Sequence, residues 1–208
     1  HPAPVVVERS YGDCKDKSVL FITLARQVGL EARFALLRTR PRGPLLREVP
    51  MQQFDHAIVY VPEQPGLESG FFVDSTADAL DVGALRQDDM GGTALVVDPE
   101  TETHAWREIP FRPPEENAQR LRTEVRLDAS GAAEGRFELR TRGIGGSAIR
   151  RLARNERALE QAMQGVVARS YGGGVLRALE AVETDSLRAP ARIALDIAVS
   201  SFARREGR

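Results

Sequence analysis

The chain has 208 residues, of which 42% are hydrophobic and 28% charged, and its formal net charge at pH 7 is -1. This composition is ordinary for a globular protein and supplies enough apolar residues for one large domain or two small ones. The lack of a basic excess argues against general nucleic-acid binding, and no apolar run approaches the roughly 18 residues that would span a bilayer. The single cysteine excludes an internal disulfide and a cysteine-based zinc cluster.

The first half of the chain predicts one helix followed by several strands. Apolar residues at helical spacing predict a helix over residues 15–29 that Gly29 ends. Strands are expected over residues 32–39, 54–61, 71–74, 94–97 and 104–108. The clearest of them reads His-Ala-Ile-Val-Tyr-Val before a proline, a run that is typical of a buried strand.

A boundary is predicted at residues 111–118, where paired prolines stiffen the chain and two acids and an amide keep it solvated. We therefore expect a catalytic core over residues 1–110, a linker over 111–118 and an accessory α+β or sandwich-like domain over 119–208. In the accessory domain, the patterns predict a hairpin of strands 121–127 and 135–142, a long helix over 147–168, and strands 175–182 and 191–199.

Three residues that carry chemistry lie at the edges of these elements. Cys14 precedes the predicted helix, where unpaired backbone N–H groups and the helix dipole favour a thiolate over a thiol. His56 opens the buried strand, and an imidazole is suited to shuttling a proton near neutral pH. Asp74 ends the next strand and could fix the tautomer of the histidine. Together they read as a Cys-His-Asp triad, with the backbone N–H of Cys14 as an oxyanion donor.

Each of these residues also has an ordinary structural interpretation. Cys14 could be a small core residue, and His56 could be a buried histidine bonded to a backbone carbonyl. Asp74 could cap a turn with Ser75 and Thr76. A zinc site made by the same cysteine, histidine and aspartate is chemically possible, but no close-spaced ligand pair supports it.

Two patterns in the second half favour structural roles over functional ones. Residues 143–148 match the G-x-G-x-x-A form of a dinucleotide fingerprint. The strand before them alternates Arg and Glu with apolar residues, which is typical of a half-exposed antiparallel strand, so we expect a strand-to-helix turn and no cofactor. Arginines at positions 150, 151, 154 and 157 are expected to form a solvated basic face of the following helix.

Three motifs follow one another in the first half: Tyr-Gly-Asp-Cys-Lys-Asp-Lys at 11–17, Phe-Asp-His-Ala-Ile-Val at 54–59 and Val-Asp-Ser-Thr at 73–76. Over residues 5–97 the chain thereby resembles the bacterial transglutaminase-like superfamily. The resemblance implies an α+β, papain-like fold in which an N-terminal helix carries the cysteine and packs on an antiparallel sheet. It implies Cys14 as nucleophile, His56 as general base and acid, and Asp74 as orienting acid, without a metal or organic cofactor.

The resemblance also implies thiol-dependent acyl chemistry on the amide bonds of a protein or peptide, by a peptidase or amidase or by a transglutaminase. The sequence does not choose between water and an amine as the acceptor, and bacterial members of the family favour hydrolysis over cross-linking. The alternative is a non-catalytic interaction scaffold that keeps the fold. Exported relatives favour a periplasmic or other extracytoplasmic site, and the oligomeric state stays open. The chain begins at His1-Pro2, with 13 residues before the cysteine. Because the family core includes upstream helices, we expect a truncated core whose longer parent is the active protein.

Overall fold

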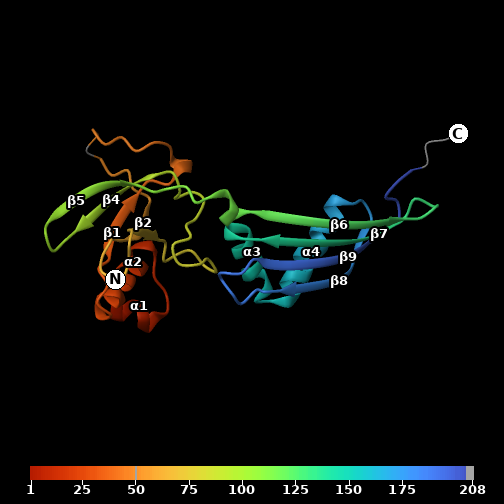
Figure 1. Cartoon of the computed structure of the whole chain (residues 1–208), viewed down its shortest axis with the longest axis horizontal. Helices are drawn as coiled ribbons and strands as arrows, with labels where there is room; N and C mark the ends of the chain where they lie inside the picture. The colour runs from red at the N-terminus through yellow and green to blue at the C-terminus, as the bar shows by residue number, and fades with distance from the viewer. Residues whose placement is uncertain (50, 205–208) are drawn as a thin grey trace. The chain divides into compact units, whose positions relative to one another are not determined.

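The computed structural model describes residues 1–49 and 51–204, and contacts divide the chain into two compact units (Figure 1). The first unit comprises residues 1–78 and 82–112, and the second comprises residues 79–81 and 113 onward. Each unit combines helices with one antiparallel sheet, so the expected α+β class is confirmed.

The first unit has a five-stranded antiparallel sheet in the order β3-β2-β1-β4-β5. Its elements are α1 (Ala3–Arg9), α2 (Cys14–Gln27), β1 (Arg33–Leu37), the 3-10 turn η1 (Arg40–Arg42), β2 (His56–Val61), β3 (Phe71–Val73), β4 (Thr93–Asp98) and β5 (Thr103–Glu108). The strands match the sequence prediction within two residues at most ends. Helix α1 was not predicted, because seven residues are too few to show a helical period.

Local sequence sets both ends of α2. Asp13 is the N-cap, and its side chain accepts hydrogen bonds from the N–H groups of Lys15 and Asp16. The helix therefore begins at Cys14, one residue earlier than predicted. At the other end Gly29 has a φ of +77°, a conformation that favours glycine. The N–H of Leu30 then reaches the carbonyl of Ala25 at 2.9 Å, which closes the helix as a Schellman motif.

Helix α2 packs on β2, and this contact makes the core of the first unit (Figure 1). All six residues of β2 are buried, as its continuous apolar run predicts. Phe21 and Ile22 of α2 pack against a buried cluster that includes Val59, Val61 and Val73. This packing fixes the first residue of α2 and the first residue of β2 relative to each other.

The second unit has a four-stranded antiparallel sheet in the order β6-β7-β9-β8 (Figure 1). Its elements are the 3-10 turn η2 (Pro114–Asn117), β6 (Gln119–Leu127), β7 (Ala133–Thr141), α3 (Gly143–Ala153), α4 (Glu156–Ser170), β8 (Gly174–Val182) and β9 (Ala191–Val199). The two helices pack on the sheet through a core that includes Ile149, Leu159, Met163 and Ile193.

The prediction of one long helix over 147–168 was wrong, because the chain forms two helices there. Arg154 and Asn155 separate α3 from α4, and Asn155 has extended backbone dihedrals. Its side chain accepts a hydrogen bond from the N–H of Ala158 at 3.0 Å, so it is the N-cap of α4. The apolar period continues across the break, which is why periodicity alone did not reveal it.

We expect Asn155→Ala to lower the free energy of unfolding by about 1 kcal/mol, because the cap hydrogen bond is lost while the helix contacts stay. Gln161→Ala, an exposed change in the middle of the same helix, is the matched control and should have little effect. Urea unfolding followed by circular dichroism measures both. Equal midpoints for the two variants would contradict the cap.

The glycine run at the start of α3 serves packing. β7 is antiparallel to both of its neighbours, as expected, and this is not the context of a dinucleotide fingerprint. A Cβ on Gly146 would lie 2.8 Å from the guanidinium of Arg150. Arg150 is only 4% exposed, so the expectation of a solvated arginine face was wrong for this residue, whereas Arg151, Arg154 and Arg157 are exposed. This glycine makes room for a buried arginine.

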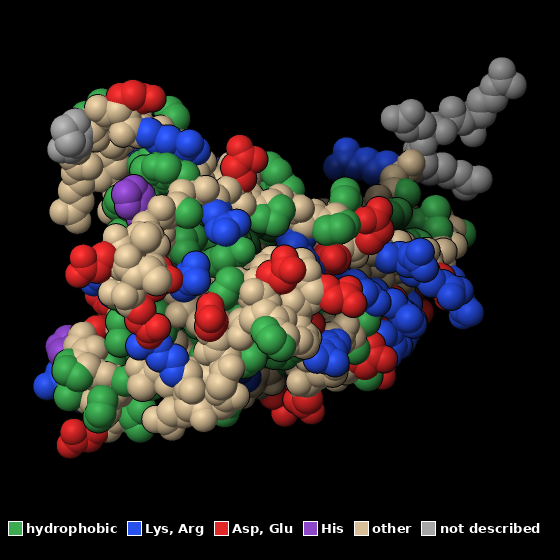
Figure 2. Space-filling view, turned by 60° about the vertical axis from the view of Figure 1, so that its left-hand side comes forward, with side chains coloured by type: hydrophobic (Ala, Val, Ile, Leu, Met, Phe, Trp, Pro, Cys, Tyr) green, Lys and Arg blue, Asp and Glu red, His purple; other side chains and the backbone are tan. Residues whose placement is uncertain are grey.

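Acidic and basic side chains are interspersed over the face of the molecule in Figure 2, in keeping with the near-zero net charge. Among the described residues, none of the helices has the length and hydropathy needed to cross a bilayer.

Candidate active site

Cys14 is the first residue of α2, and its side chain is partly exposed. The hydroxyl of Ser18, one turn later, lies 2.8 Å from the carbonyl oxygen of Cys14 and 3.3 Å from that of Ala57. Ser18 is completely buried. It therefore ties the first turn of the helix to the start of β2, next to His56.

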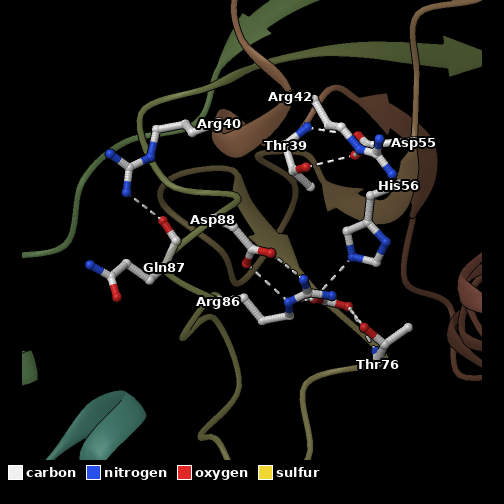
Figure 3. A network of polar contacts seen from close by, with 10 residues as sticks. Thr39, Arg40, Arg42, Asp55, His56, Thr76, Arg86, Gln87 and Asp88 are labelled. Atoms are coloured by element: carbon white, nitrogen blue, oxygen red, sulfur yellow. Dashed lines mark hydrogen bonds and ion pairs between the residues drawn. The ribbon is translucent and has the colours of Figure 1, made fainter.

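His56 is the first residue of β2, and its neighbour Asp55 anchors it (Figure 3). The carboxylate of Asp55 accepts hydrogen bonds from the N–H of Thr39 at 2.8 Å and from its hydroxyl at 2.7 Å, and pairs with Arg42 at 3.3 Å. The N–H of Asp55 donates to the carbonyl of Leu37 at 3.1 Å. These bonds fix the backbone from which the imidazole projects.

The side chains of His56 and Asp74 meet in the interior. Nε2 of His56 lies 3.1 Å from Oδ2 of Asp74, and both side chains are buried. Asp74 directly follows β3, which pairs with β2 in an antiparallel ladder. Because a carboxylate only accepts, Nε2 is the donor in this bond, and Nδ1 is the ring nitrogen that can exchange a proton with another group.

Asp74 uses its two oxygens for different partners. Oδ1 accepts from the N–H of Thr76 at 2.8 Å and from its hydroxyl at 2.7 Å. Oδ2 faces His56, and Nε of Arg86 lies 3.9 Å from it. The turn-capping interpretation and the histidine-orienting interpretation of Asp74 are therefore compatible.

The electrostatics favour an imidazolium paired with a carboxylate. Burial lowers the pKa of His56, but the hydrogen bond and charge of Asp74 outweigh it and raise this pKa to about 9. A hydrogen bond with Cys14 adds to the increase. Burial raises the pKa of Asp74, yet the hydrogen bonds from His56 and Thr76 hold it well below its ordinary value.

One group of described side chains has the spacing that a metal site requires. The ligand atoms of His56, Asp74 and Asp89 lie within 4.8 Å of one another, and Cys14 is not among them. A cation there would replace the bond between His56 and Asp74 and would approach the guanidinium of Arg86. We therefore assign no metal to this group.

A family model described as the transglutaminase-like superfamily matches residues 1–120, which is more than half of the chain. The chain belongs to the transglutaminase-like superfamily. This superfamily includes cysteine peptidases and transglutaminases, so membership indicates cysteine-based acyl chemistry at the level of the superfamily. Neither the curated proteins nor the solved structures gave a match.

Several residues of this transglutaminase-like site were not found by sequence reasoning. Ser18 lies inside the predicted helix and Asp55 directly precedes the histidine, and no local pattern marks either as part of a site. Arg86 and Asp89 lie in a polar run, Arg-Gln-Asp-Asp, that reads as a solvated turn. No local pattern distinguishes a buried aspartate in such a run from an exposed one.

Proposed function

We propose that this chain performs thiol-dependent acyl chemistry on amide bonds of a protein or peptide, with Cys14, His56 and Asp74 as its triad. The buried pair of His56 and Asp74, 3.1 Å apart beside the start of α2, is the observation that carries the proposal. Membership of the transglutaminase-like superfamily supports it. We place this chemistry in residues 1–110 and treat residues 119–208 as an accessory domain.

In the first half-reaction His56 takes the proton of Cys14, the sulfur attacks the amide carbon, and His56 gives this proton to the nitrogen as the C–N bond breaks. A thioester and a free amine result. Asp13 accepts from the N–H groups of Lys15 and Asp16, so the N–H of Cys14 is left to donate to the substrate oxygen.

In the second half-reaction water or an amine gives its proton to His56 and attacks the thioester carbon, which releases Cys14. We propose water as the usual acceptor, which makes the chain a peptidase or amidase. Asp74 holds the ring through Nε2 in both steps, so that Nδ1 exchanges the proton with sulfur and substrate.

The test is the rate at which iodoacetamide alkylates Cys14, the only cysteine, as a function of pH. A free thiol with a pKa of about 8.5 is roughly 0.3% ionised at pH 6. An imidazolium at His56 should keep alkylation fast there, and His56→Ala should slow it by about 10- to 100-fold.

His104→Ala is the matched control, because His104 is exposed on β5. It should leave the alkylation profile unchanged. A slow rate at pH 6 that His56→Ala does not alter would refute the enzyme and favour the interaction scaffold.

A further inference from the structure

Asp89 is a completely buried acid beside the proposed triad. It lies between β3 and β4, its relative exposure is 0%, and neither carboxyl oxygen has a hydrogen-bond partner among the described residues. An ionised carboxylate in such a place would be strongly destabilising. Asp89 therefore needs either a proton of its own or a cation.

The carboxyl of Asp74 faces Asp89. Oxygens of the two groups lie within 4.8 Å of each other and of a ring nitrogen of His56. Asp74 already accepts from Thr76 and His56, so it can only accept from a further neighbour. A hydrogen bond between the two acids forms only if Asp89 carries the proton.

The charges around Asp89 agree with this assignment. Burial, followed by the negative charge of Asp74, raises the pKa of Asp89 to about 7. The charges that oppose the increase are those of His56 and of Arg86. Arg86 is already paired with Asp88. Two acids that share one proton are the usual result of this proximity.

We propose that Asp89, in its acid form, is a positioning residue that donates a hydrogen bond to Asp74 and holds it against His56. This inference rests on the proposed triad. Its consequence is that the orienting acid is fixed from two sides, by Thr76 on Oδ1 and by Asp89 from the interior. Because Asp89 lies within 4.8 Å of Asp74 and Cys14 is not part of this cluster, Asp89 acts on the reaction through Asp74.

Two variants of Asp89 separate donation from packing. Asp89→Asn keeps the shape and supplies an N–H donor, whereas Asp89→Leu keeps a similar volume without one. At pH 6 we expect Asp89→Leu to slow alkylation of Cys14 by about 10- to 100-fold, as loss of a supporting hydrogen bond does in other sites. The alkylation rate of Asp89→Asn should stay within about threefold of the rate of the unsubstituted protein. Equal rates for both variants, fast or slow, would overturn the proposal.

A stability measurement tests the proton without any catalysis. Because the pKa of Asp89 is raised on folding, the folded state holds this proton between pH 4 and about 7 where the unfolded state has lost it. The free energy of unfolding should therefore fall with rising pH across this window more steeply in the parent than in Asp89→Asn. His56 and Asp74 are present in both proteins, so their contributions largely cancel. Equal slopes would overturn the proposal even if His56→Ala confirms the triad.

Two further measurements complete the test. Calorimetry with Zn²⁺ or Co²⁺ tests for a metal in place of the proton. Tight binding to the unsubstituted protein that is lost in Asp89→Asn would show that a metal occupies this position, and it would overturn the proposal. If neither variant folds, infrared spectroscopy of the parent at pH 6 decides, because a buried carboxylic acid absorbs apart from carboxylates. A carboxylic-acid band at that pH would support the proposal, and its absence would refute it.

Discussion

Replacing Asp74 with asparagine is expected to lower the rate of acyl transfer by roughly 10⁴-fold, the size of effect that this substitution has in serine triads. The N–H and the hydroxyl of Thr76 both donate to Oδ1, so the oxygen of an asparagine amide would remain on that side. Its NH₂ group would then face Nε2 of His56. Because that nitrogen would have to accept, the ring proton would move to Nδ1, and the ring could not take the proton of Cys14.

Acylation of Cys14 by p-nitrophenyl acetate measures this effect, through the release of nitrophenol and the mass of the acylated protein. Asp185→Asn changes an exposed aspartate of the second unit and is the matched control, which should acylate like the parent. If Cys14 of the Asp74→Asn variant is acylated at the same rate as in the unsubstituted protein, Asp74 only caps its turn.

Replacing Arg150 with methionine is expected to lower the free energy of unfolding of the second unit by about 3 kcal/mol. Nε of this buried arginine donates to the carbonyl of Ser186 at 3.1 Å, and a second guanidinium nitrogen donates to the carbonyl of Ala189. Both carbonyls lie in the segment between β8 and β9. A methionine fills the space but leaves these acceptors without a donor.

Arg151→Met is the matched control, because Arg151 is exposed on the same helix and donates to the hydroxyl of Ser147 at 3.1 Å. It should shift the urea midpoint little. The comparison is valid where both variants keep the parental m-value. Equal midpoints for the two variants would show that the buried guanidinium contributes nothing to stability.

The elements were predictable where a short-range pattern carries the information. The apolar run from His56 to Val61 identified β2, and Gly29 marked the end of α2. The order of Cys14, His56 and Asp74 indicated the superfamily that the family comparison shows. The break before Asn155 was missed, because an N-cap inside a continuous apolar period leaves no hydrophobic signal.

The sequence by itself predicted the α+β class, the nine strands of the described part of the chain and the three residues that the proposed chemistry needs. These follow from local periodicity, turn residues and motif order, which neighbouring positions alone encode. Only the tertiary structure decided that Nε2 of His56 meets Oδ2 of Asp74, that Arg150 is buried and that Asp89 lies against Asp74. Burial and pairing depend on residues that are far apart in the chain. The local sequence around a charged residue is therefore the same whether its side chain faces water or another carboxyl group.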